Sequence, residues 1–125
     1  MVLGTGIDVV TIEDVRRELA RGAWTAADGI FRDSELRYCN AVRSPARRLA
    51  ACFAAKEAVL KALGVGATDL EMLREVEVIG IAPGNVKVSL HGRAQRQASA
   101  HGVQRVLAAL HADRNLAAAM VILEG

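Results

Sequence analysis

Three charged residues in otherwise apolar segments have the types and spacing that phosphate chemistry needs. Asp8 lies inside the stretch V-L-G-T-G-I-D-V-V (2–10), and Glu57 and Lys61 stand one helical turn apart in F-A-A-K-E-A-V-L-K-A-L-G (53–64). Mg²⁺ is commonly bound through one or two protein carboxylates and completes its octahedron with water and phosphate oxygens. Two carboxylates on separate rigid elements therefore fit a Mg²⁺ site, and lysines beside them could hold the remaining phosphate charge.

Each of these residues also has an ordinary structural interpretation. A carboxylate inside an apolar strand costs on the order of several kcal/mol unless it is paired, hydrogen-bonded or bound to a cation. Asp8 could avoid that cost by capping the next helix or by reaching solvent. Glu57 and Lys61 could be an ion pair between successive turns of a surface helix, which contributes about 0.2–0.5 kcal/mol. From the residues alone, both interpretations stay open.

The elements that must position these residues are indicated by periodicity and by end signals. Apolar and β-branched residues predict a strand over 2–10, with glycines that let another backbone approach it. Thr11 is expected to cap a helix that ends at Gly22. The longest predicted helix runs from about Pro45 to Leu63 and carries the second acid of the candidate site.

The other segments predict shorter elements. A turn and a short helix capped by Asp33 or Ser34 are expected between the two longer helices. Period-two alternation predicts two strands that form a β-hairpin through the turn A-P-G-N (82–85). The chain is expected to close with an amphipathic helix over 92–102 and an antiparallel pair of strands over 103–110 and 116–125.

Length and composition indicate one compact domain over residues 1–125. The hydrophobic fraction is 52%, but alanine supplies much of it and aromatic residues only 3%, so such a core fills space thinly and extra burial between subunits would be unsurprising. The net charge of +2 gives no support by itself for a nucleic-acid partner. The two cysteines form no C-x-x-C motif, and the chain lacks a signal-peptide pattern and an apolar run of the ~20 residues that span a bilayer. A soluble cytoplasmic protein without a membrane partner is expected.

Three short motifs stand in a fixed order along the chain: G-I-D-V-V (6–10), F-R-D-S-E-L (31–36) and F-A-A-K-E-A-V-L-K-A-L-G (53–64). They resemble the signatures of the holo-acyl-carrier-protein synthases, which belong to the phosphopantetheinyl transferase superfamily. The order, the spacing and the total length all fit, so the resemblance covers essentially the whole chain. The resemblance favours a role for residues 53–64 as one side of an active site rather than as a surface helix with an ordinary ion pair.

The resemblance implies a fold, a reaction and a set of residues. The expected fold is a small α+β, phosphopantetheinyl transferase-like domain, with an antiparallel sheet packed on the long central helix, that forms a homotrimer with sites at the subunit interfaces. The expected reaction transfers the 4′-phosphopantetheine group of coenzyme A (CoA) to a serine of an apo acyl carrier protein, or of a polyketide or peptide carrier domain. Asp8 and Glu57 match the family's metal-binding carboxylates for Mg²⁺. Lys61 matches its phosphate-contacting lysine, and Lys56 lies in the same motif.

The expected chemistry gives Glu57 and Lys61 catalytic roles. The carrier serine attacks the β-phosphorus of CoA, adenosine 3′,5′-bisphosphate leaves, and Lys61 stabilises the departing phosphate. Either Glu57 or a water held by the metal takes the serine proton, and the sequence does not choose between them.

Two departures from the family pattern concern CoA. Cys52 stands where an arginine that helps hold a CoA phosphate is usual, and a cysteine cannot replace its charged contact. Arg47 and Arg48, one turn earlier, or Arg43 could substitute for it, or these arginines could form a solvated helix face. A-A-L-H (108–111) replaces the usual S-L-S-H, which leaves His111 either as a nucleotide contact or as a surface histidine.

A third departure concerns the carrier protein. Asp14 stands near the place of an arginine that usually faces the carrier, although Arg16, Arg17 and Arg21 could still dock an acidic carrier helix. The replacements leave open an alternative function, a catalytically degenerate relative that acts as a carrier-protein-binding or assembly subunit.

Overall fold

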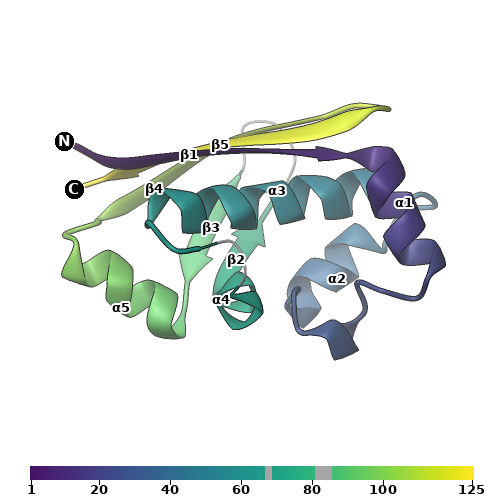
Figure 1. Cartoon of the computed structure of the whole chain (residues 1–125), viewed down its shortest axis with the longest axis horizontal. Helices are drawn as coiled ribbons and strands as arrows, with labels where there is room; N and C mark the ends of the chain where they lie inside the picture. Colours follow the sequence, from purple (N-terminus) through teal and green to yellow (C-terminus); the bar gives the residue numbers. More distant parts are fainter. Residues whose placement is uncertain (67–68, 81–85) are drawn as a thin grey trace.

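The structure is a computed structural model that describes residues 1–66, 69–80 and 86–125. The long helix α3 (Ala46–Ala62) runs through the middle of the molecule, with the three-stranded antiparallel sheet β1-β5-β4 on one side and the shorter helices and a second sheet, β2-β3, on the other (Figure 1). The strands are β1 (Val2–Thr11), β2 (Val76–Ile79), β3 (Lys87–Leu90), β4 (Arg105–Ala112) and β5 (Leu116–Glu124). The predicted α+β class, with antiparallel strands packed on a long central helix, is confirmed.

The helix ends follow the predicted glycine signals. The shorter helices are α1 (Ile12–Ala20), α2 (Asp33–Cys39), α4 (Leu70–Glu75) and α5 (Gly92–Ala100), with a 3₁₀ turn η1 (Ala26–Asp28). Gly22 follows α1 with a φ of 80° and Gly102 follows α5 with a φ of 78°, a backbone region that glycine adopts without steric cost. Helix α4 had no counterpart in the prediction from sequence, whereas the 3₁₀ turn lies in the segment expected to form a turn before α2.

The start of α2 differs from the prediction. Neither Asp33 nor Ser34 caps this helix, because it already begins at Asp33 and Arg32 occupies the cap position. The backbone N–H of Arg32 donates to Oε1 of Glu35 at 2.7 Å, so an acid in the first turn satisfies it. The hydroxyl of Ser34 donates instead to Glu77 of β2 at 2.9 Å, and thus ties α2 to the second sheet.

Strand β1 lies unusually close to α3 because two of its residues have no side chain. A Cβ atom at Gly6 would stand 2.0 Å from the carbonyl oxygen of Ala58, and one at Gly4 would stand 2.4 Å from that of Ala62. The predicted role of these glycines, the close approach of another backbone, is confirmed. Since side chains alternate along a strand, Asp8 faces α3 on the same side of β1 as Gly6.

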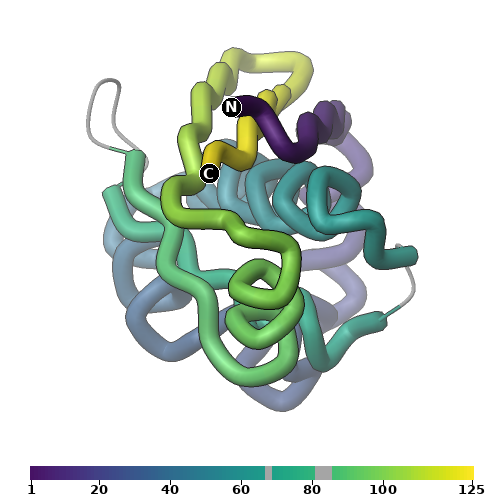
Figure 2. The backbone as a smooth tube through the Cα atoms, turned by 90° about the vertical axis from the view of Figure 1, so that its left-hand side faces the viewer, coloured from purple at the N-terminus to yellow at the C-terminus, as the bar shows by residue number. Residues whose placement is uncertain are grey.

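The ends of the chain meet at one edge of the molecule. The two termini lie next to each other (Figure 2), and the backbone N–H of Gly125 donates to the carbonyl of Met1 at 3.0 Å. Strands β2 and β3 pair antiparallel as the hairpin prediction requires, while the predicted turn at 82–85 lies outside the described residues. None of the helices in the described parts of the chain has the length and hydropathy of a membrane-spanning segment. The cytoplasmic location stays a prediction.

Candidate active site

Strand β1 brings Asp8 against the C-terminal half of α3. The Oδ1 atom of Asp8 lies 2.8 Å from Nζ of Lys61, and the same ammonium donates to the backbone carbonyl of Ile7 at 3.2 Å. The Asp8 side chain is 15% exposed and that of Lys61 is 45% exposed, so the pair lies at the edge of the core and is open to solvent from the lysine side. The carboxylate in the apolar strand is therefore paired with a cation rather than capping a helix.

Glu57 lies one turn before Lys61 on the same face of α3, and it is 8% exposed. Burial raises the pKa of Glu57, the negative charge of Asp8 raises it further, and the positive charge of Lys61 lowers it. The charges of Asp8 and Lys61 thus both act on the Glu57 carboxylate. Because the two acids repel each other across a partly buried region, an additional cation there would favour the ionised form of Glu57.

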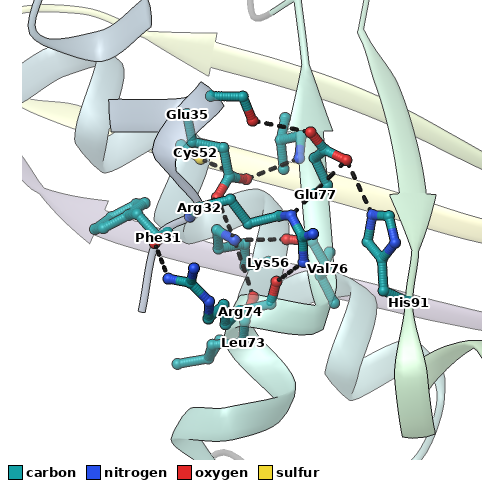
Figure 3. Close-up of polar contacts among 12 residues, drawn as sticks. Phe31, Arg32, Glu35, Cys52, Lys56, Leu73, Arg74, Val76, Glu77 and His91 are labelled. Carbon is teal, nitrogen blue, oxygen red and sulfur yellow. Dashed lines mark hydrogen bonds and ion pairs between the residues drawn. The ribbon is translucent and has the colours of Figure 1, made fainter. Parts of the chain in front are cut away.

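The structure places Lys56 away from this group, in the core on another face of α3 (Figure 3). Its ammonium lies 2.7 Å from Oε1 of Glu35 and donates to the backbone carbonyls of Leu73 (2.9 Å) and Val76 (2.5 Å). An ammonium has three protons, and these three acceptors use them all. The prediction from sequence assigned no role to Glu35 beyond its place in the F-R-D-S-E-L motif, although a buried lysine requires an acceptor of this kind.

Comparisons with known proteins agree with this geometry. The sequence pattern of the 4'-phosphopantetheinyl transferase superfamily matches residues 4–121. A holo-[acyl-carrier-protein] synthase of Syntrophus aciditrophicus is 37% identical over 100% of this chain and 98% of its own. The chain belongs to this family. It is thus a phosphopantetheinyl transferase of the holo-acyl-carrier-protein synthase type.

Solved structures show the same fold. The holo-[acyl-carrier-protein] synthase of Neisseria meningitidis superposes with a TM-score of 0.84, at 27% identity and over 100% of both chains. A Chronobacterium ammoniagenes ACPS–CoA complex superposes with a TM-score of 0.76, at 29% identity, over 96% of this chain and 95% of that one. The likeness extends over both sheets and all the helices described above, because almost the whole of each chain is covered.

Cys52, the position at which the resemblance led us to expect an arginine, is buried. Cys52 is fully buried and its thiol donates to Oε2 of Glu35 at 3.4 Å. Burial raises the pKa of the Cys52 thiol well above its usual value, so the group stays neutral. The Cys52 thiol therefore belongs to the core beside Glu35.

The other residues expected to contact CoA lie apart from Asp8, Glu57 and Lys61. Arg47 is exposed near the start of α3, ten residues before Glu57, which is about 15 Å along the helix. Arg48 donates to the backbone carbonyl of Tyr38 at 2.8 Å, and its guanidinium lies 4.1 Å from the centre of the Tyr38 ring. His111 lies on the face of the sheet that points away from α3, where its Nε2 is 3.0 Å from Asp113.

Proposed function

We propose that Asp8, Glu57 and Lys61 transfer the 4′-phosphopantetheine arm of CoA to a serine of an apo acyl carrier protein. The observation that carries this proposal is the convergence of two carboxylates and one lysine, from β1 and α3, at one site that is partly open to solvent. The relatives named holo-[acyl-carrier-protein] synthase support a carrier protein as acceptor, and the Chronobacterium ammoniagenes complex supports CoA as donor.

The reaction replaces a phosphoanhydride bond of CoA with a phosphate ester bond to the serine. The serine oxygen forms a bond to the β-phosphorus of the CoA diphosphate, and the bond from that phosphorus to the bridging oxygen breaks. Adenosine 3′,5′-bisphosphate leaves with the bridging oxygen. Lys61, whose ammonium is partly exposed, donates to the departing phosphate as its charge grows. The serine proton goes to Glu57 or to a water held beside it.

Mg²⁺ is the cation that this donor set fits. Asp8 and Glu57 offer only carboxylate oxygens, and in the described ranges no group of three or more His, Cys, Asp or Glu side chains could enclose an ion without other ligands. Mg²⁺ is usually held by one or two carboxylates together with water and substrate phosphates, which matches two acids beside a diphosphate. When bound, it supplies positive charge that offsets the charge growing on the diphosphate oxygens.

We further propose that the chain acts as a homotrimer with sites at the subunit interfaces. The face of the β1-β5-β4 sheet that points away from α3 carries exposed apolar residues, among them Ile7 (63% exposed), Val9, Leu107 and Met120. Contiguous apolar surface of this kind usually marks an interface. His111 lies on this same face, so its proposed contact with CoA would be made to the site of a neighbouring subunit.

The remaining contacts with CoA and with the carrier follow from exposure and charge. Arg47 is exposed and can reach a CoA phosphate, whereas Arg48 would have to leave Tyr38 to do so. Lys56 receives no contact with CoA in this proposal, because its three protons are used in the core. For the carrier, α1 offers exposed arginines that each pair with an acid three residues earlier. The pairs are Arg16–Glu13, Arg17–Asp14 and Arg21–Glu18.

Mass spectrometry of an apo carrier protein incubated with the enzyme, CoA and Mg²⁺ tests the function. We expect the carrier to gain the mass of phosphopantetheine, and we expect chelation of the metal to stop this gain. Asp8→Ala and Glu57→Ala should abolish it, while Glu71→Gln, a change at an exposed acid of α4, should not. Unchanged labelling by both alanine variants would refute the assigned roles. A wild-type enzyme that binds carrier without labelling it would support a non-catalytic binding subunit instead.

A further inference from the structure

The most completely connected polar group of the described chain is the buried ion pair between Glu35 of α2 and Lys56 of α3. Both side chains are fully buried, and the closest oxygen and nitrogen are 2.7 Å apart. The lysine also binds the carbonyls of Leu73 and Val76, so it ties α3 to the end of α4 and to the first residue of β2 (Figure 3). The mechanism proposed above uses neither residue.

Glu35 extends this connection to further backbone groups. Its Oε2 atom accepts the N–H of Val78 in β2 at 2.8 Å and the thiol of Cys52 at 3.4 Å. Its Oε1 atom accepts the N–H of Arg32 at the start of α2 in addition to the lysine proton. One carboxylate and one ammonium therefore join α2, α3, α4 and β2, and within the described residues no buried side-chain donor or acceptor lacks a partner.

A pair of this kind is poorly explained by stability alone. Taking two charges out of water costs free energy, and replacing a buried ion pair by apolar groups of similar volume is often neutral or stabilising. A hydrogen-bonded pair, unlike apolar contact, is directional, since its partners must lie within a narrow range of distances and angles. It can therefore specify how α3 is oriented in the molecule.

On the opposite side of α3, Lys61 binds Asp8 and the carbonyl of Ile7, but this lysine is 45% exposed and holds the helix less firmly than a fully buried pair. There α3 packs on β1 through Ala58 and Ala62 against Gly6 and Gly4, which are small and nearly smooth surfaces. Glu57 follows Lys56 directly, so the two side chains stand about 100° apart around the helix axis. A rotation of α3 by about 20° would carry a carboxylate that lies ~5–6 Å from the axis through about 2 Å. The same rotation would break the contacts of Lys56.

We propose that Glu35 and Lys56 are a positioning pair: they fix the rotation of α3, and with it the direction in which Glu57 points relative to Asp8. This inference rests on the proposed function, in which Asp8 and Glu57 act together. A misplacement on the order of 1 Å in a catalytic group can lower a rate ~10²-fold. The pair thus acts on the reaction only through Glu57 and touches neither CoA nor the carrier.

The test is the double variant Glu35→Gln/Lys56→Met, which removes both charges together and leaves neither unpaired. At low temperature, where circular dichroism shows it folded, we expect kcat for carrier labelling to fall by about 10–100-fold. We also expect calorimetry to show weaker binding of CoA in the presence of Mg²⁺, by about 10-fold. Leu123→Ala serves as the control, because it removes buried apolar volume in β5 without touching the pair. It should lower stability and keep both kcat and CoA affinity.

The outcomes separate this inference from the function on which it rests. If the folded double variant labels the carrier and binds CoA as wild type does, the inference is refuted while the function stands. If wild-type enzyme itself labels no carrier, the proposed function fails. Should the double variant not fold, Glu35→Asp decides, since it keeps both charges and shortens the acid by one methylene. A lower kcat with intact folding supports the positioning role, and wild-type values of kcat and CoA affinity overturn it.

Discussion

Replacing Gly6 by alanine should move the strand that carries Asp8. The added Cβ atom would stand 2.0 Å from the carbonyl oxygen of Ala58 and 2.9 Å from its carbonyl carbon. Since Cβ contacts under 3.0 Å are essentially never seen, β1 and α3 would have to separate locally by about 1 Å. Both neighbouring atoms belong to the helix backbone, so no side chain can turn aside to relieve the contact.

The expected change in the free energy of unfolding follows from two opposing effects. Overpacking costs about 1–3 kcal/mol, and the loss of glycine's freedom in the unfolded chain returns ~0.4–1 kcal/mol. We therefore expect Gly6→Ala to lower the free energy of unfolding by about 1–2 kcal/mol. Asp8 lies two residues further along the same side of β1 and would move with it, so kcat/KM for carrier labelling should fall by up to ~10²-fold in the folded variant.

Urea unfolding at fixed protein concentration and carrier labelling at low temperature measure the two effects. Gly66→Ala is the matched control for stability, because a Cβ atom there meets no atom of the described residues within 4 Å and the residue does not require a positive φ. It should change the free energy of unfolding by no more than ~0.5 kcal/mol. Wild-type stability and activity in Gly6→Ala would show that the close approach of β1 and α3 does not set the site.

Three further predictions concern the charge, the assembly and the carrier surface. The pKa of Glu57 is raised in the folded state, so its ionisation opposes folding above pH ~4.5. Glu57→Gln should therefore have a higher free energy of unfolding than wild type at pH 7. In urea titrations this gain in stability should vanish as the pH falls through 4.5. Ile7→Glu should dissociate the proposed trimer in sedimentation velocity, whereas Leu70→Glu, at an exposed position on α4, should leave it intact. Asp14→Asn frees Arg17 from its exposed ion pair. At low salt, KM for an acidic carrier should therefore fall while kcat stays constant. An unchanged KM would argue against α1 as the docking surface.

Local signals predicted most of the elements from the sequence. The strand of Asp8, the long helix and the last two strands have strong periodicity, and their neighbouring glycines mark turns or close approaches. The predicted cap of α2 was wrong. The sequence offers two good cap residues, Asp33 and Ser34, whereas in the structure Arg32 occupies the cap position and its backbone N–H donates to Glu35. Which of several polar residues meets a given N–H depends on the entry of the chain into the helix, and that entry is set by tertiary contacts.

Contacts between distant segments were beyond local signals. The pairing of β1 with β5, the two ends of the chain, has no sequence signature because each strand is merely apolar and alternating. The close approach of Asp8 to Lys61 also depends on this pairing, since it fixes the register of β1 over α3. The resemblance to a known family supplied that juxtaposition in advance, whereas the residues of the helix by themselves favoured an ordinary surface ion pair.

The helical period explains why two lysines of one motif have different roles. Lys56 and Lys61 are five residues apart, which places them about 140° apart around α3, so they cannot contact the same phosphate from one face. Lys61 shares its face with Glu57, and Lys56 shares its face with the buried Cys52. A third face is lined by alanines and lets the backbone of β1 come close. The proposed site therefore depends on all three faces of α3. The alanine face lets β1 approach, the face of Lys56 carries the buried ion pair that we propose sets the rotation, and the exposed face carries Glu57 and Lys61.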